Sequence, residues 1–252
     1  MRAIVVIPTY NEAPNISPLV SEVLEQRDVA GVVIVDDNSP DGTGRIADDL
    51  RQPSLARVHV IHRPGKLGLG TAYLAGMAAA LELAADRVVT MDADFSHRPE
   101  YLPRLLAASD AHELVIGSRY VPGGDVLNWG LHRRLLSRCA NLMAHRALGL
   151  QARDCTAGYR CYHADLLRRL RLDRIRSSGY SFLIEMLFVC QGEGASVAEV
   201  PIVFDDRQFG ASKISQVEIY RALQTVSRLM LKHAVRRPRA GGRVRVADGP
   251  VG

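Results

Sequence analysis

Four short apolar runs, separated by segments with helical periodicity, dominate the first 91 residues of the chain. The runs cover residues 3–7, 31–35, 58–61 and 87–91 and are rich in valine and isoleucine. Continuous apolar runs of this length are typical of strands buried on both faces, and their alternation with helices indicates parallel β-α-β units. The sequence therefore predicts an α/β fold, with right-handed crossovers and a mostly parallel sheet.

The segments between these runs predict the helices that flank the sheet. We expect helices over residues 15–27, 44–50, 71–85 and 99–108, the first capped by Asn15 and the last with Pro99 in its first turn. The second half is less regular. It predicts a strand over 114–116, a helix over 131–148 and a half-exposed or edge strand over 197–204, where apolar and polar residues alternate.

Length and composition are those of one globular domain with extensions. The chain has 252 residues, of which 47% are hydrophobic and 23% charged. Its four cysteines form no C-x-x-C pair, which favours reduced thiols in a cytosolic protein. Neither a signal peptide nor an uninterrupted apolar stretch of about 18 residues is present, so we expect no transmembrane helix.

The C-terminal region divides into a helix and a tail. Residues 215–237 predict an amphipathic helix beyond a main domain of residues 1–214, and residues 238–252 predict a disordered basic tail. The apolar stripe contains Ile219, Leu223, Val226 and Met230; the opposite stripe contains Arg221, Thr225, Arg228 and Lys232. The apolar stripe could dock on the core or lie in a membrane interface, and both alternatives stay open.

The net charge of +5 is concentrated at the C-terminal end. Seven basic residues and no acid lie between residues 228 and 245. Such a run is either a solvated tail or a contact for an anionic partner. A membrane surface suits it better than nucleic acid, because no nucleic-acid-binding motif accompanies the charge.

Two carboxylates, Asp92 and Asp94, follow the fourth apolar run. Ligands of open α/β sheets bind beyond the carboxyl ends of the strands, and Mg²⁺ takes one or two carboxylates together with substrate phosphates. A pair at this position could hold a divalent cation against a diphosphate. The alternative is a surface turn, in which Asp is also frequent.

The segments that follow the other three apolar runs add to this site. They supply an aromatic ring, further carboxylates and a loop rich in Lys and Gly, at residues 8–12, 36–43 and 63–70. A nucleoside diphosphate needs such groups for stacking, hydrogen bonding and charge neutralisation. Neither G-x-G-x-x-G after the first strand nor a Walker loop is present, which argues against nicotinamide enzymes and NTPases.

These motifs resemble those of the inverting family 2 glycosyltransferases with a GT-A fold. The chain is most similar to the dolichol-phosphate (polyprenol-phosphate) mannosyltransferase subfamily, over roughly residues 2–235. The resemblance is carried by IPTYNE at 7–12, VDDNSPDGT at 35–43, KLGLGTAY at 66–73, MDADFSHRP at 91–99, GSRY at 117–120, SRCAN at 137–141, DCTAGYR at 154–160 and GASK at 210–213.

The resemblance implies a donor site. Pro8, Tyr10 and Glu12 would line the nucleoside pocket, and Val35 and Asp37 would lie on the base and ribose side. Asp36 could equally be a structural carboxylate that holds its loop.

The resemblance also implies a metal site. Asp92 and Asp94 would hold Mg²⁺ or Mn²⁺ on the diphosphate, and Ala93 would offer backbone contacts. Ser96 stands where some relatives carry a Gln ligand, and its shorter side chain could act through water.

An acceptor site is implied by the second half. Arg119, Arg133 and Ser137 match positions that grip the acceptor's phosphate, although the neighbouring Arg134 could replace Arg133 as the anchor. Arg207 and Lys213 match basic positions on a loop that contacts the donor diphosphate. Asp94, Arg119, Arg207 and Lys213 are therefore the candidate catalytic residues.

The activity that the resemblance implies is transfer of mannose from GDP-mannose to a polyprenol or dolichyl monophosphate. A phosphate acceptor is already ionised near neutral pH and needs no general base, whereas a sugar hydroxyl does. Donation of glucose from UDP-glucose, or a glycan acceptor, is the alternative. We expect a protein at the cytoplasmic face of a membrane, held by the C-terminal helix and tail and aided by a membrane-protein partner, with no nucleic-acid partner.

Overall fold

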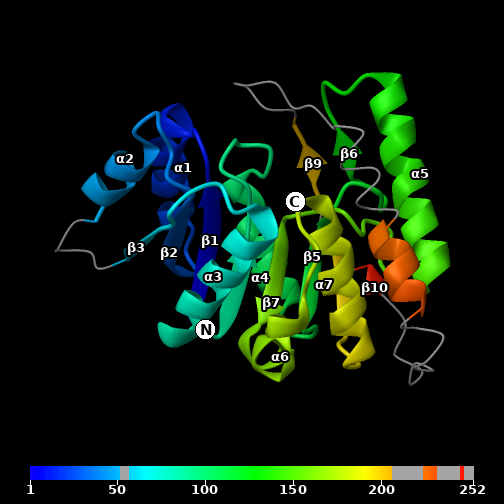
Figure 1. Ribbon diagram of the computed structural model, residues 1–252. Coiled ribbons are helices and arrows are strands. Elements are labelled where there is room, and N and C mark those ends of the chain that lie inside the picture. Colours follow the sequence, from blue (N-terminus) through cyan, green and yellow to red (C-terminus); the bar gives the residue numbers. More distant parts are fainter. Residues whose placement is uncertain (52–56, 206–223, 232–244, 247–252) are drawn as a thin grey trace.

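The computed structural model describes residues 1–51, 57–205, 224–231 and 245–246. Its centre is a sheet of eight strands in the order β10-β8-β5-β7-β4-β1-β2-β3 (Figure 1). These strands are β1 (Ala3–Thr9), β2 (Val29–Asp36), β3 (Val58–His62), β4 (Arg87–Thr90), β5 (Leu114–Ser118), β7 (Arg160–His163), β8 (Val197–Pro201) and β10 (Arg245–Val246). Two further strands, β6 (Asp125–Val126) and β9 (Val203–Phe204), form a small separate sheet.

All neighbouring strands of the large sheet run parallel except at β7, which is antiparallel to both β4 and β5. The predicted mostly parallel α/β fold is thus confirmed. The reversal of β7 has a consequence for the site. Its N-terminal end, rather than its C-terminal end, meets the carboxyl ends of the parallel strands, so the segment before β7 joins that edge of the sheet.

Helices cover both faces of the sheet, and alternate residues of the strands pack against each layer. Figure 1 shows α1 (Ala13–Glu25), α2 (Thr43–Asp49) and α4 (Leu102–Ala108) together with the other helices α3 (Leu69–Glu82), α5 (Leu131–Leu148), α6 (Ala164–Arg169) and α7 (Tyr180–Gly192). Val5 and Ile7 of β1 pack in the core that contains α1, whereas Ile4 and Val6 pack in the core that contains α3 and α7. Two short 3-10 helices, Pro99–Tyr101 and Leu172–Arg174, and a helical stretch at 224–231 are also described.

The first predicted helix begins earlier than expected. α1 starts at Ala13, with Glu12 at the N-cap position and Pro14 in its first turn, so Asn15 is not the cap. Asn15 is buried and donates from its side chain to the carboxylate of Glu12 at 2.8 Å. The helix can start there because Pro14 has no backbone N–H to satisfy in the first turn.

The prediction of a half-exposed or edge strand over 197–204 is wrong for β8, whereas Val203 and Phe204 form β9, a half-buried strand of the two-stranded sheet. β8 pairs with β5 on one side and β10 on the other, and its residues from Val197 to Val200 are buried. The polar residue that suggested exposure, Glu199, is 1% exposed, and its carboxylate accepts the backbone N–H groups of Arg153 and Asp154. Burial of this carboxylate is compatible with the fold because both oxygens have donors.

The helix predicted over 215–237 is described only at 224–231, where the chain is helical. Val226 and Leu229 are buried in the core, and Arg228 pairs with the buried Glu185 of α7 at 2.8 Å. Met230, assigned to the apolar stripe, is 45% exposed, whereas Thr225 is buried. This turn therefore docks on the body of the protein; the tail of 238–252 lies outside the described residues except for β10.

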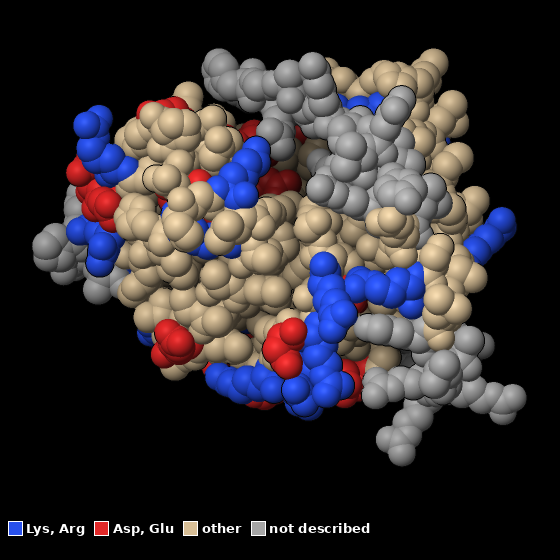
Figure 2. Space-filling model, in the orientation of Figure 1, with Lys and Arg blue, Asp and Glu red and all other residues tan. Residues whose placement is uncertain are grey.

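The loops that meet at the carboxyl edge of the sheet surround a hollow. Figure 2 shows this hollow near the top of the molecule, with acidic side chains on its floor. Within the described part of the chain, no helix is both long and apolar enough to cross a membrane.

Candidate active site

The loop after β2 is held together by Asp36. Its carboxylate accepts the hydroxyls of Thr9 and Ser39, at 3.1 and 2.5 Å, and the backbone N–H of Ser39 at 3.1 Å. Asp36 is 2% exposed. These contacts agree with the alternative that Asp36 is a structural carboxylate, since its oxygens are directed to its own loop and to β1.

Asp37 points the other way and pairs with Arg63, which follows β3. Both side chains are buried, and Arg63 also donates to the hydroxyl of Thr71 at 2.8 Å and to the carbonyl of Gly68 at 3.2 Å. Arg63 thus connects the predicted ribose-side carboxylate to the first turn of α3. The sequence places Arg63 at a strand end but gives no sign that it pairs with Asp37.

The predicted nucleoside-pocket residues follow β1. Tyr10 is 36% exposed, and the ammonium group of Lys66 lies 4.1 Å from the centroid of its ring, a cation–π contact. Pro8 is half-buried in β1, and Val35 is fully buried. The backbone N–H of Glu12 donates to Thr43 at 2.9 Å, so the loops after β1 and β2 are fastened to each other.

The D-x-D segment forms a tight turn after β4. Asp94 is 5% exposed, and its Oδ1 accepts the hydroxyl and the backbone N–H of Ser96, at 2.5 and 3.1 Å. Phe95 between them has a φ of 61°, a left-handed conformation that is uncommon for an aromatic residue. Such strain is frequent at functional sites, and here it lets Ser96 reach back to Asp94. Ala93 is buried.

Asp92 is the more open of the two carboxylates, with its side chain 33% exposed. Its Oδ1 accepts the hydroxyl of Tyr73 at 2.8 Å. Burial and the nearby Asp92 raise the pKa of Tyr73 well above its usual range, so the phenol stays protonated and donates. The backbone N–H of Asp92 donates to Nδ1 of His97 at 2.9 Å.

His97 accepts this bond as a neutral imidazole. Burial lowers the pKa of His97, and the opposing effects of Asp92 and Asp94 do not compensate. The ring of His97 stacks on Tyr159 at a centroid distance of 5.0 Å and meets Phe204 edge to face at 5.5 Å. The packed ring of His97 therefore holds the backbone of the D-x-D segment in place through its bond to Asp92.

The residues of this turn suit a divalent cation that is shared with a diphosphate. Asp92 and Asp94 are hard oxygen donors fixed by Tyr73 and Ser96, and an ion held by two carboxylates needs further oxygens from its substrate. Among the described residues, no group of three or more His, Cys, Asp and Glu could hold a metal. Ser96, predicted as a third ligand, donates to Asp94.

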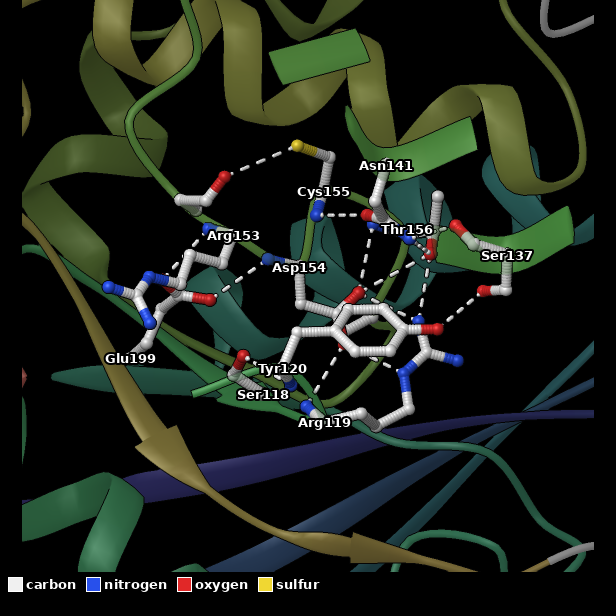
Figure 3. Close-up of polar contacts among 12 residues, drawn as sticks. Ser118, Arg119, Tyr120, Ser137, Asn141, Arg153, Asp154, Cys155, Thr156 and Glu199 are labelled. Atoms are coloured by element: carbon white, nitrogen blue, oxygen red, sulfur yellow. Dashed lines mark hydrogen bonds and ion pairs between the residues drawn. The ribbon is translucent and has the colours of Figure 1, made fainter. Parts of the chain in front are cut away.

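Arg119 directly follows β5 and forms a bidentate pair with Asp154 (Figure 3). Asp154 is fully buried, and Arg119 also donates to the hydroxyl of Thr156 at 2.8 Å. Burial would raise the pKa of Asp154, but the charge and hydrogen bonds of Arg119 outweigh it and the pKa is lowered. Asp154 is therefore ionised, and its carboxylate holds the guanidinium of Arg119 in a fixed orientation.

The segment before β7 carries Asp154 and is held from two directions. Asn141 of α5 accepts the backbone N–H of Cys155 at 2.7 Å and donates to the hydroxyl of Thr156 at 3.1 Å, as Figure 3 shows. From the opposite direction, Glu199 of β8 accepts the N–H of Asp154 at 2.9 Å. The reversed strand β7 thus brings this segment to the site.

The N-terminal half of α5 carries the other residues that were predicted to bind the acceptor's phosphate. The guanidinium carbon of Arg133 lies 4.0 Å from the centroid of the Trp129 ring, and that of Arg119 lies 5.6 Å from the same centroid. The hydroxyl of Ser137 accepts that of Tyr120 at 2.7 Å. Arg134 turns away, donating to the carbonyl of Val126 in β6. The geometry therefore favours Arg133, rather than Arg134, as the candidate anchor of the acceptor's phosphate.

Not all candidates can be located. Arg207 and Lys213 lie outside the described residues. Sequence reasoning missed the groups that orient the predicted ones, which are Arg63, Tyr73, His97, Trp129 and Asp154. Tyr73, His97 and Asp154 stand inside the family motifs at 66–73, 91–99 and 154–160, which was the available signal for them.

Comparison with known proteins identifies the family of the chain. Residues 4–171 match the model of glycosyl transferase family 2. The polyprenol monophosphomannose synthase of Mycolicibacterium smegmatis is 46% identical over 227 residues, which are 90% of this chain and 86% of that protein. The undecaprenyl-phosphate mannosyltransferase of Micrococcus luteus is 46% identical over 228 residues, which are 90% of this chain and 93% of that protein.

Solved structures share the fold at lower identity. Mannosyl-3-phosphoglycerate synthase from Rubrobacter xylanophilus has a TM-score of 0.65 at 17% identity, over 94% of this chain and 76% of that one. Glucosyl-3-phosphoglycerate synthase from Mycobacterium tuberculosis, solved with Mn²⁺ and UDP, has a TM-score of 0.61 at 18% identity, over 98% of this chain and 89% of that one. With its family model, curated relatives and GT-A architecture in agreement, the chain belongs to glycosyl transferase family 2 and is a glycosyltransferase.

Proposed function

We propose that the enzyme transfers mannose from GDP-mannose to the phosphate of a polyprenol monophosphate, with inversion at the anomeric carbon. The names of the two curated relatives support both the sugar and the class of acceptor. The structural observation that carries the proposal is that Arg119 and Arg133 both lie against the ring of Trp129. Two guanidinium groups at one ring are suited to a dianionic phosphate monoester.

The donor would lie on the opposite side of the hollow. Pro8, Tyr10, Glu12, Val35 and Asp37 would contact the nucleoside, with Asp37 oriented by Arg63. Asp92 and Asp94 would hold Mg²⁺ or Mn²⁺, with Ala93 and Ser96 completing the turn. When bound, the cation neutralises charge on the departing nucleoside diphosphate. Arg207 and Lys213 would add positive charge there.

Proton chemistry favours a phosphate acceptor over a hydroxyl acceptor. Attack by a sugar hydroxyl needs a group that takes up its proton, and Asp154 is a poor proton acceptor because Arg119 keeps its pKa low. A phosphate monoester has a second pKa of about 6 and attacks already ionised. The role of Arg119, Arg133 and Ser137 is then to orient its oxygens towards the anomeric carbon.

The test is an assay with radiolabelled GDP-mannose and polyprenol phosphate, with and without a chelator. Label in the organic phase that disappears with chelator is expected. Transfer from UDP-glucose instead, or label in a water-soluble glycan, would support the alternative donor or acceptor. No transfer with any donor would refute the proposal. Because the acceptor is a lipid, we also propose peripheral attachment at the cytoplasmic face of a membrane, aided by a membrane-protein partner.

A further inference from the structure

The D-x-D turn and the N-terminal end of α5 belong to different parts of the chain, and the short strand β9 contacts both. In Figure 1, β9 and β6 lie side by side next to α5. On the other side, the backbone N–H of Val203 in β9 donates at 3.2 Å to the hydroxyl of Tyr101, in the 3-10 helix that follows the D-x-D segment. The end of β9 is therefore placed to connect the two parts of the site.

Phe204, the last residue of β9, contacts an aromatic ring on each side. Its ring meets that of His97 edge to face, with a centroid distance of 5.5 Å and an interplanar angle of 73°. It meets the ring of Trp129 in the same way, at 5.6 Å and 72°. Edge-to-face contacts of this length are the favoured geometry of aromatic pairs. Because His97 holds the backbone N–H of Asp92 and Trp129 lies against Arg133, Phe204 joins the two parts of the site through packed rings.

Asp205, the next residue, makes the same connection through polar contacts. Its Oδ2 accepts a hydrogen bond from Arg98 at 3.3 Å, and its Oδ1 accepts one from the side-chain amide of Asn128 at 2.8 Å. Arg98 directly follows His97 in the sequence, and Asn128 directly precedes Trp129. The side chain of Asp205 is only 22% exposed, so both contacts are partly shielded from water.

Three pairs of consecutive residues thus meet in two layers. The aromatic layer consists of His97, Phe204 and Trp129, and the polar layer consists of Arg98, Asp205 and Asn128. We call Phe204 and Asp205, which stand at the centre of the two layers, the bridge. A single contact leaves rotation free, whereas contacts from two consecutive residues fix both the separation and the relative orientation of the parts they join.

The backbone extends the bridge to α5. The carbonyl of Phe204 accepts the backbone N–H of Leu127 at 2.8 Å, which adds to the pairing of β9 with β6. Arg134 of α5 donates to the carbonyl of Val126 in β6. A displacement of the bridge would therefore move the beginning of α5, which carries Arg133, relative to the D-x-D turn.

The separation of these two parts matters for a transfer reaction. In a productive complex the reacting atoms lie about 3–3.5 Å apart, and a misplacement of about 1 Å can lower the rate about 100-fold. In the proposed reaction the donor is held from the side of Asp92, and the acceptor phosphate is held from the side of Arg119 and Arg133. The distance between the reacting atoms then follows from the distance between the two sides.

We propose that Phe204 and Asp205 are positioning residues, which hold the D-x-D turn and the two arginines at the separation that attack of the acceptor on the anomeric carbon requires. The inference rests on the proposed function for the identity of the acceptor. Phe204 also lies beside Arg119, whose guanidinium carbon is 5.4 Å from the centroid of its ring. The alternative is that the two residues only stabilise the fold, which would change stability but not the partition between reactions.

The first measurement compares two reactions of the same bound donor. Transfer needs both sides of the site, whereas hydrolysis, in which water attacks the anomeric carbon and releases the free sugar and the nucleoside diphosphate, needs only the donor side. Phe204→Leu and Asp205→Ala are expected to lower the kcat of transfer to polyprenol phosphate about 10- to 100-fold, with the donor KM and the rate of hydrolysis unchanged within about twofold. Phe204→Tyr, which keeps the ring, should restore most of the kcat. Equal losses in both reactions, or no loss in transfer, would overturn the proposal.

Two variants away from the bridge are the matched controls. Phe188→Leu removes a partly buried ring of α7, and Asp165→Ala removes a carboxylate of α6 that pairs with Arg168 at 2.8 Å. Both should keep the wild-type ratio of transfer to hydrolysis, even where the melting temperature falls. If Phe188→Leu lowers this ratio as much as Phe204→Leu does, the effect is a loss of stability and the proposal is overturned.

The second measurement does not depend on activity, because Trp129 is the only tryptophan of the chain. Its indole nitrogen is buried, so its N–H gives a single NMR signal that is protected from exchange with water. Mn²⁺ bound with GDP at the D-x-D turn broadens this signal by an amount that falls steeply with the distance between them. We expect equal broadening in the wild type and Phe188→Leu, and broadening changed about twofold or more in Phe204→Leu and Asp205→Ala.

The two measurements separate failure of this inference from failure of the proposed function. If the wild type transfers no mannose to polyprenol phosphate, the proposed function fails, and the broadening still decides whether the bridge sets the separation. If the wild type transfers mannose and the broadening is the same in all four proteins, the proposed function holds and the role of Phe204 and Asp205 is refuted.

Discussion

Asp154 holds the guanidinium of Arg119 by two hydrogen bonds of 2.7 Å, from Nε to Oδ2 and from Nη2 to Oδ1. The carboxylate is fully buried, and the side chain of Arg119 is only 7% exposed. Removal of one partner from a buried pair leaves the other charge without compensation, which is more costly than removal of both. The pair therefore fixes the direction of the guanidinium that we propose binds the acceptor phosphate, and it also contributes to folding.

Asp154→Ala is expected to lower the free energy of unfolding by about 3–5 kcal/mol, measured by urea denaturation. Arg119→Met should have a cost of similar size, and the double variant should lose less than the sum of the two single variants. Additive losses would show that the pair is not energetically coupled. Asp110→Ala, at an exposed carboxylate, is the control and should cost less than about 0.5 kcal/mol.

The same pair predicts a dependence of stability on pH. The pKa of Asp154 is lower in the folded protein than its usual value, because Arg119 outweighs the effect of burial. Its stabilising contribution is thus complete above the unfolded pKa of about 3.9 and is lost as the pH falls through the folded pKa. The difference in unfolding free energy between wild type and Asp154→Asn should be constant above pH of about 5 and shrink below about 4. A difference that grows on acidification would contradict this assignment, with Asp110→Asn as the control.

Much of the first half of this fold could be predicted, because its strands and helices have local signals. The apolar runs at 3–7, 31–35, 58–61 and 87–91 became β1 to β4 with ends shifted by at most two residues. The D-x-D segment was found because its position after a buried strand places it at the carboxyl edge of the sheet. The location of Asp92 and Asp94 directly after a strand can be read from the neighbouring residues alone.

The elements of the second half were harder to predict because their hydrophobic residues do not follow a strand or helix period. β7 begins with Arg160, which is fully buried and donates to the carbonyls of Cys155, Ala157 and Leu183. A charged residue in a four-residue strand does not suggest a central position. Helix α7 is mostly apolar around its circumference and lacks the 3.6-residue pattern of a surface helix, so it was not predicted.

The partners of the site residues could not be predicted for a related reason. Tyr73 meets Asp92 across 19 positions of sequence, and Arg119 meets Asp154 across 35. Such pairs are created by strand order, and above all by the reversal of β7. The sequence therefore predicted which residues would gather at the edge but not which of them would be neutralised by a partner.

The contact between Ser96 and Asp94 leads to a prediction about metal dependence. If Ser96 orients a metal-binding carboxylate, Ser96→Ala should raise the Mn²⁺ concentration needed for half-maximal activity by about 10- to 100-fold and leave some activity at saturation. Asp94→Asn should abolish transfer at any metal concentration while the circular dichroism spectrum is unchanged. Ser39→Ala, which removes a bond of the same 2.5 Å length to Asp36, is the matched control. An equal shift in both serine variants would mean that the effect is not specific to the metal site.

Arg133 and Arg134 are adjacent but have different surroundings, and their substitutions should separate. Arg133→Gln is expected to raise the KM for polyprenol phosphate about tenfold or more at an unchanged KM for the sugar donor, since it removes a charge-assisted contact to phosphate. Arg134→Gln should mainly lower the melting temperature, because Arg134 bonds to the carbonyl of Val126. The reverse pattern would make Arg134 the acceptor anchor.

Close packing of α3 on β1 places the donor loops, and Gly76 makes it possible. A Cβ atom at this position would lie 2.2 Å from Cγ1 of Val6 and 3.1 Å from Cγ2 of Val35, closer than atoms in van der Waals contact. Gly76→Ala should therefore push α3 away from the sheet and lower the free energy of unfolding by about 1–3 kcal/mol or more. Gly192 in α7 has no atom within 4 Å of such a Cβ, so Gly192→Ala is the matched control and should be neutral or stabilising by up to about 1 kcal/mol. Because Tyr73 of α3 bonds to Asp92, the Gly76 variant should also lose transfer activity below its melting temperature, measured with GDP-mannose at 25 °C for comparison with the control. Full activity in a destabilised Gly76→Ala protein would mean that the D-x-D turn does not depend on the position of α3.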